Sequence, residues 1–122
     1  MNDRRRVLIV EDDPTLGALL KGALEAAGHE VAVATSRSAA LVAVPDLSPD
    51  VICVDLDLPD GTGWQLIDEL EKRRITPPMV IVATAGLDAS RSRRRPGTFV
   101  LTKPFPIDSL LRLLSGQEPA EI

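Results

Sequence analysis

The chain has 122 residues, of which 44% are hydrophobic and 26% are charged, with a net charge of −4 at pH 7. These values are typical of one folded domain with a single core. Nucleic-acid affinity depends on Lys and Arg clustered over a whole face, so the negative net charge argues against direct binding to nucleic acid. Basic residues cluster only locally, at 4–6, 72–74 and 91–95, and we expect these to be solvated surface.

The N-terminal stretch MNDRRRVLIVEDD has an apolar run of only four residues, too short for a signal peptide or a membrane span. Cys53, the single cysteine, lies in the apolar run VICV, where we expect a small buried residue and no disulfide. These features predict a cytoplasmic protein that does not contact a membrane. His29 is expected at the surface, and Trp64 is expected to pack against the core.

The first predicted elements are a strand and a helix. The run VLIV at 7–10 is rich in β-branched residues and lacks the alternation of a half-exposed strand, which predicts a strand covered on both faces. Leu and Ala then recur every three or four positions over 16–27, which predicts a helix face. Asp13 is its expected N-cap, Pro14 lies in its first turn, and Gly28 follows its end.

The middle of the chain continues the same alternation. EVAVAT at 30–35 predicts a strand, and a short helix is expected near 38–44, ending before Pro45. VICV at 51–54 predicts another buried strand. After the turn residues DGTG, apolar residues over 66–70 mark a further helix.

The last third contains two strands, MVIVAT at 79–84 and TFVLT at 98–102, and a helix over 107–114 that ends at a glycine. Between the strands, 86–97 has one large apolar residue, so we expect its helix, the fourth, to be short or disordered. The tail at 117–122 has little apolar content and is expected to be flexible.

The order of these elements predicts an α/β fold. Strands that alternate with helices form a parallel sheet with right-handed crossovers and helices on both faces, which is a doubly wound arrangement. No repeat or linker divides the chain. We therefore expect a single domain over 1–122, with a core from about residue 6 to about residue 115.

Polar residues gather where the predicted strands end. The first strand is followed by Glu11, Asp12 and Asp13, the third ends in Asp55 and Asp57, the fourth in Thr84, and the fifth is followed by Lys103. In an open parallel sheet, ligands bind at the carboxyl ends of the strands. Each residue could have a local role alone, such as Asp13 as a helix cap, but their joint placement predicts a binding site.

The chemistry of this cluster indicates a metal and a phosphoryl group. Two carboxylates about 4 Å apart repel each other by roughly 4 kcal/mol at an effective dielectric of about 20, so the cluster needs a counter-charge. Oxygen ligands without His or Cys favour Mg²⁺, held by Asp12 with help from Glu11. Aspartate can form an aspartyl phosphate, and Asp55 is placed to attack. Thr84 and Lys103 could donate to the phosphoryl oxygens.

The motifs VLIVEDD, PDVICVDLDLPDGTGWQL, VIVATA and VLTKPF together resemble the receiver domain of two-component response regulators, the CheY-like superfamily. The similarity spans about 6–115. It implies a flavodoxin-like sheet of five strands in the order 2-1-3-4-5 with about five helices. It further implies that Asp55 accepts phosphate from a histidine kinase or a histidine phosphotransfer protein, which changes the binding of a downstream protein target.

The resemblance also assigns the other site residues. Mg²⁺ would be bound by Glu11, Asp12 and Asp55, together with the backbone carbonyl of Asp57. Thr84 would be the switch hydroxyl. Lys103 would pair with the phosphate, and the bond from Lys103 to Pro104 would be cis. A receiver assists only its own phosphorylation and dephosphorylation, so the chain is not expected to be an enzyme; a homodimer is one possible assembly.

Two departures from the family pattern concern the output. Receivers usually have Tyr or Phe three residues before the lysine, whereas this chain has Val100, and the period of two in a strand sends Phe99 to the other face. The segment from Thr84 to Lys103 is about three residues shorter than the family pattern. We therefore expect phosphorylation to be intact and its usual readout to be altered around 86–97, with RSRRR at 91–95 a partner contact or loose surface.

Two alternatives remain open from the sequence. One is an interaction module that has the fold but is never phosphorylated, which Val100 and the short segment favour and the complete acid, threonine and lysine set opposes. The other is a phosphatase of the haloacid-dehalogenase type, because VDLDLPDGT resembles its nucleophile motif. That motif normally ends the first strand of a longer chain. The chain could act as a stand-alone regulator, a relay intermediate or a fragment of a larger protein.

Overall fold

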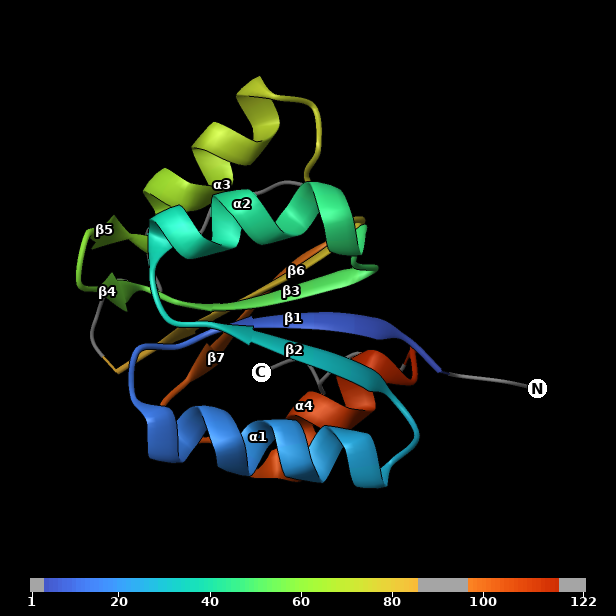
Figure 1. The fold of residues 1–122 in the computed structure, drawn as a ribbon. Helices are drawn as coiled ribbons and strands as arrows, with labels where there is room; N and C mark the ends of the chain where they lie inside the picture. Colours follow the sequence, from blue (N-terminus) through green and yellow to red (C-terminus); the bar gives the residue numbers. More distant parts are fainter. Residues whose placement is uncertain (1–3, 86–96, 117–122) are drawn as a thin grey trace.

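The computed structural model describes residues 4–85 and 97–116 and shows a parallel sheet between two layers of helices (Figure 1). The strands of the main sheet are β1 (Arg6–Val10), β2 (Glu30–Ala34), β3 (Val51–Asp55), β6 (Met79–Thr84) and β7 (Thr98–Thr102). The helices in the described part are α1 (Pro14–Ala26), α2 (Arg37–Leu47), α3 (Gly63–Lys72) and α4 (Ile107–Leu114). The sheet order is β2-β1-β3-β6-β7 with every pair parallel, which confirms the predicted flavodoxin-like order.

The sheet buries both faces, as the uninterrupted apolar runs predict. Figure 1 shows α1 and α4 on one side of it and α2 and α3 on the other. Alternate residues of a strand point to opposite faces, so Val7 and Ile9 pack with α1 and α4, while Leu8 and Val10 pack with α2 and α3. All four are at most 1% exposed. Two cores on one rigid sheet fix the positions of the strand ends.

Helix α1 has the predicted start and end. The carboxylate of Asp13 accepts hydrogen bonds from the backbone N–H groups of Thr15 (2.9 Å) and Leu16 (3.3 Å), so Asp13 is the N-cap. Gly28, just past the end, has φ +100°, a conformation that glycine adopts without steric cost. Leu19 departs from the expected apolar face, because 59% of it is exposed.

Helix α2 is longer than the sequence predicts. It continues through Pro45 to Leu47, whereas the prediction ended it before the proline. Pro45 cannot donate a hydrogen bond to the preceding turn, but this loss falls in the last turn of the helix, where it affects one bond. Burial of Val44 (3% exposed) and a hydrogen bond from the N–H of Ser48 to its carbonyl (2.9 Å) keep that turn helical.

A small antiparallel hairpin, which the sequence analysis did not predict, joins β3 to α3. Its strands are β4 (Asp57–Leu58) and β5 (Gly61–Thr62). Thr62 then caps α3, since its hydroxyl accepts from the N–H of Gln65 (3.1 Å) and the Gln65 side chain accepts from the N–H of Thr62 (2.9 Å). The hairpin therefore connects the end of β3 rigidly to the start of α3.

Of the first arginines, Arg4 and Arg6 are exposed, as expected, whereas Arg5 is half-buried, and both Arg5 and Arg6 bind the ends of helices. Arg5 Nε donates to the carbonyl of Leu114 in α4 (2.5 Å), and Arg6 donates to the carbonyl of Leu47 in α2 (3.1 Å). His29 is buried, with 9% exposed, and its Nδ1 accepts from the N–H of Arg5 (3.0 Å). The prediction of a surface histidine was therefore wrong, because β1 begins beside it.

Several predictions lie outside the described residues: the short or disordered fourth helix expected in 86–97, of which only Gly97 is described, the basic run at 91–95, and the flexible tail at 117–122. Across the part of the chain that the structure describes, no helix combines the length and apolar character needed to cross a membrane.

Candidate functional site

The parallel sheet brings the predicted polar residues to one edge. Glu11 follows β1, Asp55 is the last residue of β3, Thr84 is the last residue of β6, and Lys103 follows β7. These four strands are neighbours in the sheet, and their carboxyl ends point the same way. The backbone N–H of Lys103 donates to the carbonyl of Thr84 (2.7 Å), which ties the last two ends together.

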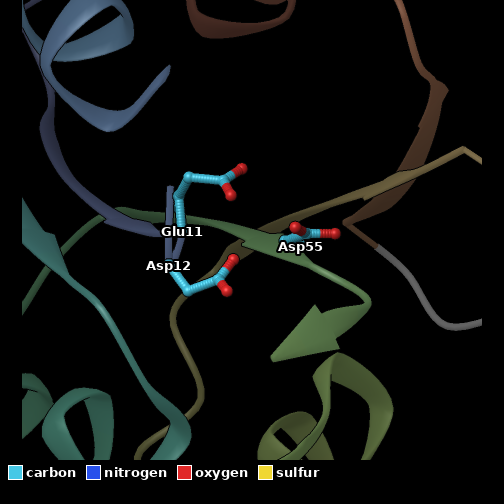
Figure 2. A group of neighbouring side chains, drawn as sticks. All are labelled: Glu11, Asp12 and Asp55. Carbon is cyan, nitrogen blue, oxygen red and sulfur yellow. The ribbon is translucent and has the colours of Figure 1, made fainter. Parts of the chain in front are cut away.

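Three carboxylates form the centre of this edge. One oxygen from each of Glu11, Asp12 and Asp55 lies within 4.8 Å of the others, and Figure 2 shows the three side chains at the ends of β1 and β3. Glu11 (4% exposed) and Asp55 (7% exposed) are buried, whereas Asp12 is exposed. Carboxylates at this spacing repel one another, and burial of Glu11 and Asp55 strengthens the repulsion, so the cluster attracts positive charge.

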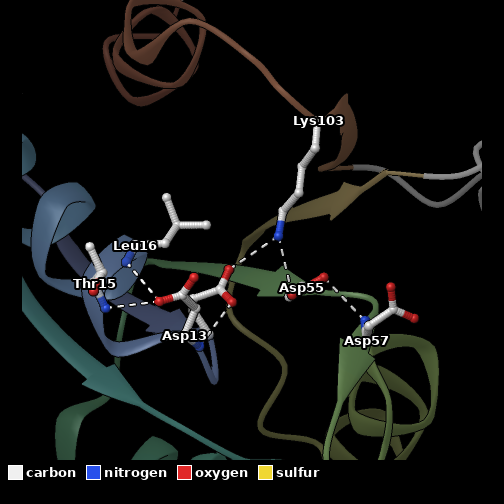
Figure 3. A network of polar contacts seen from close by, with 7 residues as sticks. Asp13, Thr15, Leu16, Asp55, Asp57 and Lys103 are labelled. Carbon is white, nitrogen blue, oxygen red and sulfur yellow. Dashed lines mark hydrogen bonds and ion pairs between the residues drawn. The ribbon is translucent and has the colours of Figure 1, made fainter.

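Lys103 supplies part of that charge. Its Nζ lies 3.2 Å from Glu11 Oε1 and 3.2 Å from Asp55 Oδ2 (Figure 3). The other oxygen of Asp55, Oδ1, accepts from the backbone N–H of Asp57 (3.1 Å). Both oxygens of Asp55 are thus oriented, and the three carboxylates with one ammonium leave two negative charges to be neutralised.

The titration of the site follows from burial and these contacts. Burial raises the pKa of Glu11, and the negative charge of Asp55 raises it further. The hydrogen bond from the backbone N–H of Asp13 and the positive side chain of Lys103 act in the opposite direction. Burial alone would lower the pKa of Lys103, but its bonds to Asp55 and Glu11 outweigh burial and raise the pKa. Lys103 therefore stays charged at neutral pH, whereas the ionised form of Glu11 is disfavoured by its burial.

Asp13 and Asp57 have different places from the clustered acids. Asp13 caps α1, as predicted, and its backbone N–H donates to Glu11 Oε2 (3.2 Å). Asp57 does not end β3 as the sequence suggested; it lies in β4, its side chain is exposed, and its backbone faces Asp55. The bond from Lys103 to Pro104 is cis, as the family resemblance implied.

Two residues near the site were missed by the sequence analysis. A side chain at Gly63 would place Cβ 2.7 Å from the carbonyl oxygen of Asp55, so only glycine allows α3 to begin this close to the site. Asp60, at the tip of the hairpin, binds the start of α2. The turn residues DGTG gave a local signal for Gly63. The partners of Asp60, Arg37 and Ser38, lie 23 and 22 residues away in the sequence, so no local pattern indicated this contact.

The residues that depart from the family pattern lie as expected on the two faces of β7. Val100 packs with the core between the sheet and α2 and α3, and Phe99 packs with the core on the α1 and α4 side. Phe99 therefore cannot replace the missing aromatic ring at position 100. This confirms the expected orientation, which follows from the period of two along a strand.

A cavity of about 390 Å³ borders the site on the α1 side. The charged residues Glu11, Asp55 and Lys103 line part of it, and most of the remaining wall is apolar and includes Cys53 and Ala85. The small side chain of Ala85, which follows Thr84, is exposed.

Cys53 is predicted to be unreactive in the folded protein. Burial raises the pKa of its thiol to about 12, and the charge of Glu11 acts in the same direction. Since the thiolate is the reactive form, labelling by a thiol reagent near pH 8 should be on the order of a thousand times slower than for a free thiol. Labelling in urea, where the chain unfolds, is the control and should be rapid. Rapid labelling without urea would contradict the buried position.

Comparisons with known proteins give the same fold and identify the family of the chain. The family model of the response regulator receiver domain matches residues 7–115. The transcriptional regulatory protein TcrA of Mycobacterium tuberculosis is 34% identical over 119 residues, which cover 93% of this chain and 47% of that protein. This chain spans about half the length, or less, of the curated relatives it matches.

Solved structures of receiver domains have the same fold as this chain. The receiver domain of the Francisella response regulator 1452 has a TM-score of 0.79 and 30% identity, over 92% of this chain and 97% of that one. The non-phosphorylated HemR receiver domain of Leptospira biflexa has a TM-score of 0.77 and 30% identity, over 96% of this chain and 98% of that one.

The fold and the site together define a doubly wound α/β domain with an acidic pocket at the carboxyl ends of its strands. With the family match over most of its length, the chain belongs to the response regulator receiver domain family of two-component systems.

Proposed function

We propose that Asp55 is the phosphoryl acceptor of this receiver domain. The observation that carries this proposal is the position of Asp55: its two oxygens are held by Lys103 Nζ (3.2 Å) and the N–H of Asp57 (3.1 Å), beside the carboxylates of Glu11 and Asp12. A nucleophilic carboxylate needs fixed orientation and a counter-charge for the incoming phosphate oxygens, and these contacts supply orientation and part of the charge.

The proposed step is an in-line transfer from a phosphohistidine. An oxygen of Asp55 attacks phosphorus and forms the new P–O bond, while the P–N bond of the donor breaks. The electron pair of that bond goes to the imidazole nitrogen, which then takes a proton from water. Lys103 donates to a phosphoryl oxygen throughout, and the hydroxyl of Thr84 is proposed to donate to another once the phosphate is in place.

The residues fit a Mg²⁺ ion. The donor set is entirely oxygen, as Mg²⁺ prefers, and two negative charges remain after Lys103 is counted. We propose that Glu11, Asp12, Asp55 and the backbone carbonyl of Asp57 hold it. When bound, Mg²⁺ supplies the positive charge that lets the carboxylates and the phosphoryl oxygens lie together.

The donor is proposed to be a histidine kinase or a histidine phosphotransfer protein, and the readout a change in binding to a downstream protein or to a second copy of the chain. The domain then modifies only itself, so no separate substrate is turned over. The net charge of −4 favours a protein target over nucleic acid for this chain. The family match favours a receiver over the haloacid-dehalogenase-type phosphatase.

The test uses acetyl phosphate and Mg²⁺ with the purified chain, read by intact mass. We expect one phosphoryl group per chain, none in the presence of EDTA, and no sustained hydrolysis of a phosphomonoester substrate. An unchanged mass with Mg²⁺ present, in a chain that is folded, would favour the alternative that Val100 suggests, a module that binds partners without being phosphorylated.

A further inference from the structure

Asp60 connects the hairpin beside the site to a helix far away in the sequence. Its Oδ1 accepts from the backbone N–H of Arg37 (2.7 Å) and its Oδ2 from that of Ser38 (3.0 Å). The side chain of Arg37 returns the contact, since its Nε donates to the backbone carbonyl of Asp60 (3.2 Å). Three hydrogen bonds therefore join the tip of the β4–β5 hairpin to the first turn of α2.

These bonds satisfy the helix as well as the hairpin. The first N–H groups of a helix have no partner within it, and the first turn of α2 contains no acidic residue. Ser36 caps one of these groups, the N–H of Ala39 (3.1 Å), and Asp60 takes the two before it. Hydrogen bonds from Ser38 and Arg37 lower the pKa of Asp60, so its carboxylate stays ionised at the positive end of the helix dipole.

The same hairpin leads directly to the phosphorylation site. Leu58 pairs with Gly61 next to the tip, and Asp57 pairs with Thr62 one step further. At that step the N–H of Asp57 binds Asp55 Oδ1 (3.1 Å). Thr62 also caps α3, so the β5 side of the hairpin is fixed to α3 and the tip is fixed to α2. The backbone of Asp57, including its carbonyl group, therefore lies in the stretch of chain between Asp55 and these two anchors.

We propose that Asp60 is a positioning residue for the metal site: by binding the first turn of α2 it holds the hairpin, and hence the backbone carbonyl of Asp57, where Mg²⁺ needs it. This inference rests on the proposed function, in which that carbonyl is a ligand. Asp60 itself touches neither the metal nor the phosphate. Groups that hold ligands in place typically change metal affinity by about 10-fold to 100-fold when they are lost.

The experiment measures the Mg²⁺ dissociation constant by isothermal titration calorimetry for the wild type, Asp60→Ala and Asp60→Asn. We expect Asp60→Ala to weaken Mg²⁺ binding about tenfold. Asp60→Asn keeps one acceptor oxygen and should recover part of the affinity. Asp46→Ala, an exposed aspartate at the other end of α2, gives the same charge change and should leave the affinity unchanged. Amide hydrogen exchange at Arg37 and Ser38 reports independently whether the anchor is broken.

Faster exchange at both amides in Asp60→Ala together with weaker Mg²⁺ binding would support the inference. Faster exchange with an unchanged dissociation constant would overturn it and leave the proposed function standing. Equal weakening by Asp46→Ala would also overturn it, because net charge would then be the cause. If Asp60→Ala does not fold, the same comparison is made with Asp60→Asn. A wild type that binds no Mg²⁺ would overturn the proposed function and this inference with it.

Discussion

Replacement of Asp55 by Asn should abolish incorporation of phosphate from acetyl phosphate while the fold remains intact. The amide of Asn is a poor nucleophile, and the change also removes one of three carboxylates proposed to hold Mg²⁺. Removing one of three mutually repelling charges should not destabilise the protein, since Lys103 keeps its contact with Glu11 (3.2 Å). Intact mass after incubation measures the phosphate, and circular dichroism checks the fold.

Asp57→Asn is the matched control for this change. It removes the same charge two residues away, but the Asp57 side chain is exposed and only the backbone is assigned a role. We expect phosphorylation at a rate within about threefold of the wild type, because surface charges are screened. If Asp55→Asn incorporated as much phosphate as the wild type, another residue would have to accept the phosphate.

Replacement of Lys103 by Met should have two effects of opposite sign. Without the ammonium, Glu11 and Asp55 lose the positive charge that Lys103 provides, so Mg²⁺ should bind more tightly, on the order of tenfold. Phosphorylation should nevertheless become slower by about 100-fold, because the proposed donor to the developing charge on the phosphoryl oxygens is lost. Calorimetry measures the first effect, and the initial rate of mass change measures the second.

The control for this pair of measurements is Lys21→Met. Lys21 is half-buried on α1, with 41% of its side chain exposed, and it pairs with Glu25 (2.7 Å), so its loss changes the net charge equally without touching the site. Both quantities should stay near the wild-type values. If Lys103→Met weakened Mg²⁺ binding, Lys103 would have to hold the acidic residues in place instead of competing with the metal for them.

The main sheet was predictable because its central strands β1, β3 and β6 are buried on both faces. Runs such as 7–10 and 51–54 have no other stable place in a chain of this size, and alternation with helices fixes parallel pairing. The β4–β5 hairpin was missed because its strands have two residues each, too few for any periodicity. The extension of α2 past Pro45 was missed because it depends on the burial of Val44, a tertiary contact.

The members of the acidic site were predictable for a different reason. Strand ends of a parallel sheet meet at one edge, so Glu11, Asp55 and Lys103 could be placed together from the strand boundaries alone. The contacts between them were not predictable, because they depend on side-chain reach across strands. Asp60 is the clearest case: its sequence context indicates only a turn, while its partners lie at the start of α2.

Chemical trapping of the phosphorylated residue tests the acceptor role of Asp55 most directly. Borohydride reduces an acyl phosphate to an alcohol, which converts a phosphorylated aspartate to homoserine at that position. After incubation with acetyl phosphate and Mg²⁺, reduction and proteolysis, peptide mass spectrometry should find homoserine at position 55 and nowhere else, and none without Mg²⁺. Phosphate recovered on another residue, or a folded chain with no homoserine at all, would contradict the assignment of Asp55 as the acceptor.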